Sequence, residues 1–187
     1  MKDIYQNCPL FENEQYLLRL ISYEDLADLL KVYSDPKSVP LFNSDNCNGD
    51  DFHYTTMERM RQAIDFWLWE YGNRMYVRMS IIDKGTRCAV GTTELFVRTA
   101  TDYFTDCLLL RLDLRSDFER SMAIEEILGL IFEQALPYFP CKMIATKAIP
   151  VATQRIEALK RLGFVPTEEK VIGHGGIEYG DYFAKAN

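Results

Sequence analysis

The chain has 187 residues, of which 48% are hydrophobic and 26% are charged. These proportions are typical of one ordinary globular domain and differ from those of disordered, collagenous or membrane proteins. The 28 acidic and 21 basic residues give a formal net charge of -7, so no diffuse basic surface is expected to hold a nucleic-acid backbone. No apolar run approaches the roughly 20 residues that a membrane span needs, and the first residues lack the apolar core of a signal peptide. We therefore predict a single cytoplasmic domain over residues 1–187 that binds neither nucleic acid nor membrane.

The five cysteines and two histidines do not have the spacing of a disulfide framework or of a metal site. The cysteines are odd in number, widely separated and without a CxxC pair, which predicts free thiols. Neither His53 nor His174 has a second His or Cys three or four positions away. No metal ion is predicted.

Strand and helix signals alternate in the first part of the chain. The predicted elements are a strand at 16–21, a helix that begins at Ser22 and ends at Asp35, a loop over 40–54, and a helix that opens at 55–58 and is closed by Gly72. On the second helix, Trp67 and Trp69 lie about 200° apart around the axis. One of the two indoles is therefore expected to be buried and the other exposed.

Three extended runs follow, at 76–82, 88–98 and 104–115, and their short connections predict an antiparallel meander. The apolar period then changes to that of a long helix that ends at Pro137. The remaining predicted elements are a strand at 143–149, a helix at 152–162, and two extended runs that flank the glycines at 173–176. A right-handed crossover through the long helix makes the strands at 104–115 and 143–149 parallel. The fold class is therefore α+β.

Alternation along the third meander strand separates charged from apolar side chains. Arg111, Asp113 and Arg115 fall on one face of this strand, and leucines fall on the other. The charged row either holds a charged group of a substrate or is a solvated, mutually paired row. The sequence leaves both interpretations open.

Several short motifs follow one another along nearly the whole chain. They are Tyr33-Ser34-Asp35-Pro36, Val90-Gly91-Thr92-Thr93-Glu94-Leu95, Leu112-Asp113-Leu114, Ile149-Pro150 with the segment from Ile156 to Phe164, and Tyr179-Gly180-Asp181-Tyr182. In this order and at this spacing they resemble the GNAT superfamily of N-acetyltransferases, and especially its ribosomal-protein N-terminal acetyltransferase branch. The resemblance implies a mixed sheet of about seven strands, with an antiparallel meander plus one parallel splayed pair, flanked by about four helices.

The resemblance also implies an acetyl-CoA site in the gap between the two parallel strands. Main-chain groups of Leu112, Asp113 and Leu114 would pair with the pantetheine amides as a missing strand would. The pyrophosphate would lie on the N-terminus of the long helix, where free N–H groups and the helix dipole attract anions. The residues implied for that end of the site are Arg120, Ser121, Met122 and Ala123.

The pyrophosphate turn departs from the family pattern of Arg or Gln, two residues, Gly, one residue, then Gly or Ala. Of the aligned residues 118–123, only Ala123 fits, and Ser121 replaces the glycine. Asp117 and Glu119 place two carboxylates at the same turn, where they would compete with a pyrophosphate. The question for the structure is whether the helix starts early, with Glu119 folded back over its end, or near Ser121.

Glu94 and Tyr179 are the predicted catalytic residues. Glu94 lies on the strand next to the one that would carry acetyl-CoA, and partial burial there would raise its pKa and suit it to act as a general base. The alternative for Glu94 is an exposed carboxylate paired with Arg78 or Arg111 across the strands. Tyr179 and Tyr182 are predicted on opposite faces of the last strand, so that only one reaches the cleft as a proton donor.

Two functions follow from the sequence. The first is an N-acetyltransferase in which a primary amine, a peptide N-terminus or a small amine, attacks acetyl-CoA directly in a ternary complex. An acidic chain suits such a cationic acceptor. The second is a GNAT-fold binding or interaction module that has lost catalysis and binds CoA weakly or not at all, which the altered turn at 118–123 motivates. The sequence is compatible with a monomer and with a homodimer.

Overall fold

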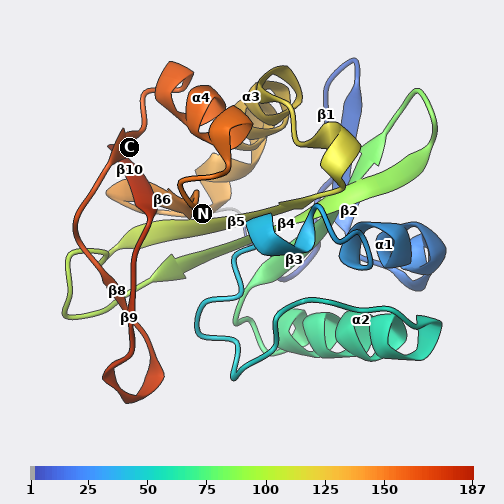
Figure 1. The fold of residues 1–187 in the computed structure, drawn as a ribbon, viewed down its shortest axis with the longest axis horizontal. Helices are drawn as coiled ribbons and strands as arrows, with labels where there is room; N and C mark the ends of the chain where they lie inside the picture. The colour runs from blue at the N-terminus through green and yellow to red at the C-terminus, as the bar shows by residue number, and fades with distance from the viewer. Residues whose placement is uncertain (1–2) are drawn as a thin grey trace.

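An eight-stranded mixed sheet forms the centre of the computed structural model, which describes residues 3–187 (Figure 1). The order of its strands is β1-β2-β3-β4-β5-β6-β10-β7, and β8 and β9 form a separate hairpin. The strands are β1 (Phe11–Glu12), β2 (Tyr16–Leu20), β3 (Val77–Asp83), β4 (Cys88–Arg98), β5 (Cys107–Leu114), β6 (Met143–Lys147), β7 (Val165–Pro166), β8 (Val171–Ile172), β9 (Glu178–Tyr179) and β10 (Tyr182–Ala186). Within these described strands, β5 and β6 pair in parallel and the other neighbours are antiparallel. The predicted α+β fold with one parallel pair is confirmed.

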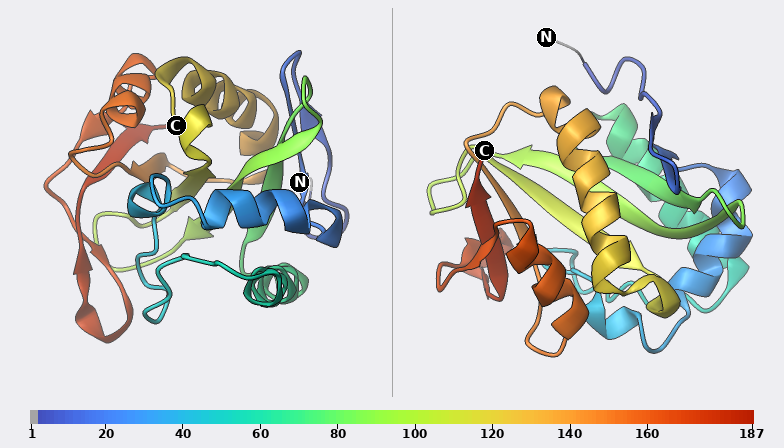
Figure 2. Two further views of the ribbon diagram at one scale, coloured as in Figure 1. Left: turned by 45° about the vertical axis from the view of Figure 1, so that its right-hand side comes forward. Right: turned by 90° about the horizontal axis from the view of Figure 1, so that it is seen from above.

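Helices cover both faces of the sheet (Figures 1 and 2). They are α1 (Leu26–Tyr33), α2 (Met57–Gly72), α3 (Ser121–Leu130) and α4 (Thr153–Arg161). Helices α3 and α4 lie on one face, and α1 and α2 lie on the other. None of the helices in residues 3–187 has the length and apolar character needed to cross a membrane.

The two faces of β5 differ as its alternation predicts. Leu110, Leu112 and Leu114 belong to the apolar core beneath α3 and α4. Asp113, on the opposite face, contacts the tyrosine at the end of α1, and Arg111 contacts the loop before α2. The strand therefore has one apolar face and one polar face.

The ends of the long predicted helix differ from a regular α-helix. A 3₁₀ turn at Ser116–Phe118 comes first, and α3 itself begins at Ser121. After Leu130 the backbone continues as a π-helical turn at Ile131–Ala135 and a 3₁₀ turn at 136–138. Pro137, which lacks an N–H donor, lies in that last turn.

The last extended segment is two strands rather than one. Tyr179 ends β9 and Tyr182 begins β10, and between them Asp181 has a φ of 64°. This left-handed residue interrupts the extended backbone. The prediction that Tyr179 and Tyr182 lie on opposite faces of a single strand is therefore wrong.

The parallel pair separates before β5 ends. Cys107–Leu110 pair with Met143–Thr146, whereas β5 continues beside β4 as far as Leu114. The N–H of Arg115 donates to the carbonyl of Val90 on the β4 side, at 2.9 Å. Because peptide groups alternate in direction along a strand, those of Leu112 and Leu114 face away from β4 and into the gap beside β6. The gap therefore presents unpaired main-chain groups of β5.

A glycine in β4 permits close approach of β5 at this point. A Cβ atom added to Gly91 would lie 2.2 Å from the carbonyl oxygen of Asp113 and 2.8 Å from a methyl group of Leu114. The register of β3 and β4 also shifts beside this position, at a bulge between Ile81 and Ile82. Gly91 is required here by space, since the nearest neighbour of an added Cβ atom is a backbone oxygen, which cannot turn aside as a flexible side chain can.

We predict that Gly91→Ala destabilises the fold by about 3 kcal/mol, because the added methyl group has to move the β5 backbone. The control is Gly129→Ala on α3, where an added Cβ meets nothing within 4 Å. That change should stabilise the fold by about 0.5–1 kcal/mol, since alanine favours a helix. Urea unfolding of both variants measures the difference. Similar free energies of unfolding for the two variants would contradict the close approach at Gly91.

Candidate active site

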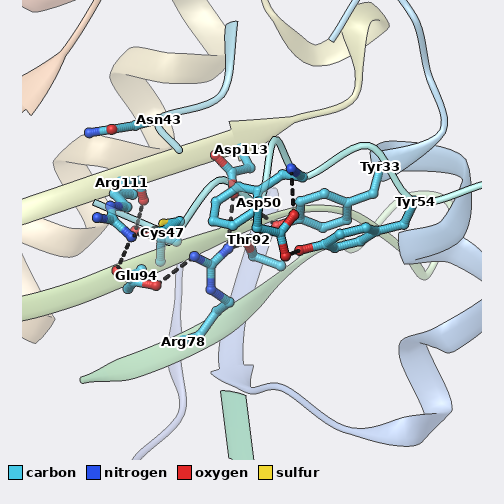
Figure 3. Close-up of polar contacts among 12 residues, drawn as sticks. Tyr33, Asn43, Cys47, Asp50, Tyr54, Arg78, Thr92, Glu94, Arg111 and Asp113 are labelled. Atoms are coloured by element: carbon cyan, nitrogen blue, oxygen red, sulfur yellow. Dashed lines mark hydrogen bonds and ion pairs between the residues drawn. The ribbon is translucent and has the colours of Figure 1, made fainter. Parts of the chain in front are cut away.

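A cluster of charged side chains is buried between the sheet and helices α1 and α2 (Figure 3). One nitrogen of the Arg78 guanidinium lies 2.5 Å from Glu94 Oε2, and another lies 2.9 Å from Asp113 Oδ2. Arg111 approaches Glu94 from the other side, with its Nη1 at 3.0 Å from Oε1. Arg78 and Asp113 are fully buried and Glu94 is 2% exposed. Two guanidinium groups thus face two carboxylates away from water.

Strand register brings these residues together. Arg78, Glu94 and Arg111 are directly opposite one another on β3, β4 and β5. Thr92 and Asp113 form a second cross-strand pair on the same face, two residues further along. Opposite charges on directly paired residues stabilise neighbouring strands. Three consecutive strands of the meander therefore contribute one continuous polar patch.

Aromatic residues enclose the cluster. The hydroxyl of Tyr33, at the end of α1, donates to Asp113 Oδ2 at 2.9 Å and lies 2.7 Å from Thr92 Oγ1. The Arg78 guanidinium lies 4.3 Å from the centroid of a Trp67 ring and 5.3 Å from that of Phe52. Such cation–π contacts favour an arginine that has been removed from water.

The ionisation of the two buried carboxyls differs. Burial alone would raise the pKa of Glu94, but the charges of Arg111 and Arg78 hold it below its ordinary value. Burial raises the pKa of Asp113, although Arg78 opposes that shift. Glu94 is therefore a firmly ionised partner in two ion pairs, which makes it a weak proton acceptor.

A cavity of about 500 Å³ lies beside this cluster, between α2, the loop over 42–54 and the polar face of the sheet. We call it the aromatic cavity, because six aromatic side chains line it: Phe52, Tyr54, Phe66, Trp67, Tyr76 and Phe96. Its charged lining consists of Asp50, Arg59, Glu70, Glu94 and Arg111. As predicted, one indole of α2 is buried and the other exposed: Trp67 is 2% exposed and faces this cavity, and Trp69 is 61% exposed. The volume suits a small organic ligand or the end of a chain.

The backbone of the loop is strained where it enters the cavity. Phe52 has a φ of 62°, although its ring is buried. Its N–H donates to the carboxylate of Asp50 at 2.9 Å, which supports this conformation. A left-handed phenylalanine is costly and persists only where the surrounding structure determines it. Here it places the ring edge-on to Trp67, with centroids 6.5 Å apart.

Three strands hold the loop over the site. Arg111 of β5 donates to the carbonyl of Asp45 at 2.7 Å. The Asp45 carboxylate pairs with Lys147 of β6 at 2.7 Å and accepts from the hydroxyl of Tyr182 on β10 at 3.1 Å. The loop therefore crosses the polar side of the gap between β5 and β6.

A second cavity, of about 390 Å³, lies at the N-terminus of α3, on the α3 and α4 side of the sheet. We call it the helix-end cavity. Its lining includes Arg120, Ser121, Met122 and Ala123, together with Gln154 of α4 and residues Gln15, Tyr16 and Glu126. The N–H of Ser121 donates to the side-chain oxygen of Gln154 at 3.1 Å. An oxygen acceptor thus already occupies the first donor at the helix end.

The two carboxylates of the turn before α3 are both paired. Asp117 pairs with Arg115, with the closest atoms at 2.6 Å. Glu119 forms a two-pronged ion pair with Arg155 of α4, with both contacts at 2.8 Å. Arg155 is 2% exposed, and its guanidinium also donates to the carbonyl of Leu41 at 3.1 Å. Glu119 therefore does not fold back over the end of α3, which starts at Ser121.

The structure places the other predicted residues as follows. The main-chain groups of Leu112 and Leu114 face the gap, whereas the peptide groups of Asp113 face β4 and its side chain belongs to the buried cluster. Tyr179 lies in the β8–β9 hairpin, packs against the small apolar cluster that includes Phe104, and lines neither cavity. The catalytic assignments of Glu94 and Tyr179 stay predictions.

Sequence reasoning missed Arg78 as the centre of the cluster and Glu70 as part of the aromatic cavity. The sequence indicates Arg78 only as one of two alternative cross-strand partners of an exposed Glu94. Glu70 follows Trp67 by three residues on α2, and this spacing places both on one helix face. That spacing is the one signal in the sequence that links Glu70 to the site. Among residues 3–187, no group of three or more His, Cys, Asp or Glu side chains is arranged to hold a metal ion.

The fold is that of GNAT-type acetyltransferases. The ribosomal-protein-S5-alanine acetyltransferase from Vibrio fischeri superposes with a TM-score of 0.65 at 19% identity, covering 96% of this chain and 97% of that one. A GNAT-family acetyltransferase from Bacillus anthracis gives 0.67 at 15% identity, with 96% and 98% covered. The microcin C7 self-immunity acetyltransferase, solved with acetyl-CoA and AMP, gives 0.69 at 12% identity, with 94% of each chain covered. By sequence, the chain matches no family model and no curated protein.

We predict that Arg78→Met costs about 3–5 kcal/mol of stability near pH 7, because Asp113 and Glu94 lose their shared buried cation. An unpaired buried carboxyl has a raised pKa, so the folded variant binds more protons than its unfolded chain between the ordinary pKa and the raised one. The variant should therefore recover stability relative to the unchanged protein as the pH falls toward 5.

The control for this experiment is Arg161→Met, which removes a half-exposed guanidinium that pairs with Glu157 and Glu125. Its unfolding midpoint in urea should stay close to that of the unchanged protein at both pH values. A loss in Arg78→Met that is no greater than in the control, or one that grows as the pH falls, would refute the buried pairing.

Proposed function

We propose that the chain is a member of the GNAT superfamily and an N-acetyltransferase that transfers an acetyl group from acetyl-CoA to a primary amine. Acetyl-CoA supplies the acetyl group as a reactive thioester. The observation that carries the proposal is the gap beyond the β5–β6 pairing, where the peptide groups of Leu112 and Leu114 are unpaired, together with one cavity on each side of the sheet. The GNAT fold supports the proposal by analogy.

The residues present fit acetyl-CoA. The free peptide groups of Leu112 and Leu114 can hold the amides of the pantetheine arm as an added strand would. The N-terminus of α3 offers N–H donors and a helix dipole for the pyrophosphate, and Arg120 lines the same cavity. Asp113 contributes through its side chain, which fixes β5 from the opposite face.

The pairing of the nearby acids supports cofactor binding. Asp117 and Glu119 each have an arginine partner, so their charges are compensated within the turn. The start of α3 at Ser121 leaves its first turn facing the helix-end cavity. The departures of the turn from the family pattern therefore do not by themselves prevent an anion from binding.

The placement of the two cavities supports direct transfer in a ternary complex. The helix-end cavity lies on the α3 and α4 side, and the aromatic cavity lies on the α1 and α2 side. Acetyl-CoA and the amine would thus approach the gap from opposite faces. Both can be bound at once, and the nitrogen can attack the thioester without a covalent enzyme intermediate.

One observation favours a second candidate, a binding module without catalysis. The side chain of Gln154 already accepts the hydrogen bond from Ser121 that a phosphate oxygen would accept. In this alternative the helix end satisfies its own donors and CoA binds weakly or not at all. A titration separates the two functions.

We predict that acetyl-CoA binds with micromolar affinity in a calorimetric titration, and that Ser121→Asp weakens binding at least about tenfold by placing a carboxylate against the pyrophosphate. The control is Thr101→Asp, which adds the same charge at an exposed loop position between β4 and β5. Its affinity should not change. Absence of binding to the unchanged protein at millimolar acetyl-CoA would overturn the proposed function in favour of the binding module.

A further inference from the structure

The aromatic cavity contains three carboxylates, and two of them have a cation beside them. Glu94 pairs with Arg111 at 3.0 Å, and Asp50 pairs with Arg59 at 2.5 Å. Three acids against two arginines leave the lining with one negative charge in excess. Within residues 3–187, the carboxylate of Glu70 has no ion-pair partner. The excess charge is therefore located at Glu70.

Glu70 is placed by its helix and not by a flexible loop. It lies one turn from Trp67 and two turns from Ala63 on α2, and all three line the cavity. Its side chain is half-buried. Burial raises the pKa of the Glu70 carboxyl, and the nearby charge of Glu94 raises it further. This direction is opposite to that of Glu94, which two guanidinium groups keep ionised.

The remaining lining defines what kind of cation fits beside this carboxylate. Six aromatic rings line the wall, and Met75 adds a further apolar surface. A strongly hydrated cation with no apolar part would leave these rings unmatched. A primary ammonium joined to an aromatic or apolar group satisfies both the single excess charge and the aromatic wall.

We propose that Glu70 binds the acceptor amine and removes its proton, and that the acceptor is a primary ammonium attached to an aromatic group. This inference rests on the proposed function. The ammonium gives one proton to Glu70, and its nitrogen then forms a bond to the thioester carbonyl carbon. The carbon–sulfur bond breaks, the sulfur takes a second proton from the nitrogen, and Glu70 releases its proton to water. The products are an N-acetyl amine and free CoA, and atoms and charge balance.

Several other titratable or charged groups line the cavity around Glu70. They are Cys47, Asp50, Tyr54, Arg59, Tyr76, Glu94, Arg111 and His174. Glu94 is the one carboxylate of this lining that the sheet contributes, and it is held by two arginines. Glu70 and Glu94 can therefore be compared directly, since each is changed to glutamine without loss of shape.

The first arm of the test measures amine binding without acetyl-CoA, by calorimetry. Phenethylamine represents a small aromatic amine, a tripeptide with N-terminal phenylalanine represents a peptide N-terminus, and 2-phenylethanol is the uncharged control. We expect Glu70→Gln to weaken the binding of the amine that fits by about tenfold or more, and to leave 2-phenylethanol unchanged. Glu58→Gln, an exposed change in the first turn of the same helix, should have no effect. If only one of the two amines binds, that result shows whether the acceptor is a small aromatic amine or a peptide N-terminus. If neither amine binds, the proposal is overturned.

The second arm measures release of the CoA thiol over a range of pH, with acetyl-CoA and the amine that binds. For the unchanged protein, kcat/KM should rise with pH as Glu70 loses its proton. Glu70→Gln should lower kcat at least about a hundredfold and remove this rise, since a general base contributes that much. If Glu94→Gln removes the rise and Glu70→Gln keeps it, Glu94 is the base and the proposal is overturned.

The two arms separate the failure of this inference from failure of the proposed function. If acetyl-CoA does not bind or no thiol is released with any amine, the acetyltransferase function fails, while the first arm still tests whether Glu70 holds an ammonium. If transfer occurs and both Glu70→Gln and Glu58→Gln behave like the unchanged protein, the function stands and the role of Glu70 is refuted.

Discussion

The buried guanidinium of Arg78 is the interaction on which the rest of the polar face depends. It joins β3 to β4 through Glu94 and to β5 through Asp113, and Asp113 in turn accepts from the hydroxyl of Tyr33 on α1. Removing ions from water costs several kcal/mol each, so the cluster is tolerated only because each charge has an opposite partner. A gain in folding stability is thus a poor explanation for the presence of this buried cluster. Its geometric effect is clear: it fixes three strands and one helix around the aromatic cavity, and it keeps Glu94 ionised.

The two faces of the sheet differ in the side chains that they carry and in the cavity beside them. The face beneath α3 and α4 is apolar, and its leucines hold the long helix whose N-terminus faces the helix-end cavity. The opposite face carries the paired charges and the aromatic cavity. The two faces meet where β5 separates from β6, because there alternate peptide groups of one strand lose their neighbour. The proposed reaction between two ligands on opposite faces needs such an opening, and parallel strands that diverge provide it without breaking the core.

Local patterns predicted most elements of the fold but few details of the site. Periodicity and capping residues predicted the strands, the parallel pair, and that one indole of α2 is buried and the other exposed, because these depend on neighbours within a few positions. Pairing of Arg155 with Glu119, 36 residues away, depends on how α4 packs against the turn before α3. The left-handed Asp181, which separates Tyr179 from Tyr182, carries no strong signal in a single sequence. Glu70 was missed because an acid on a helix is normally solvent-facing, and only the tertiary position of α2 makes it part of a cavity.

The shared guanidinium of Arg155 also limits how this sequence can change. It neutralises Glu119 at the turn before α3 and at the same time holds the carbonyl of Leu41, at the start of the loop that leads to the aromatic cavity. A neutral residue at 119 would leave a buried cation, and a shorter residue at 155 would leave a buried carboxylate and an unbonded carbonyl. Positions 119 and 155 are therefore expected to vary together among related chains.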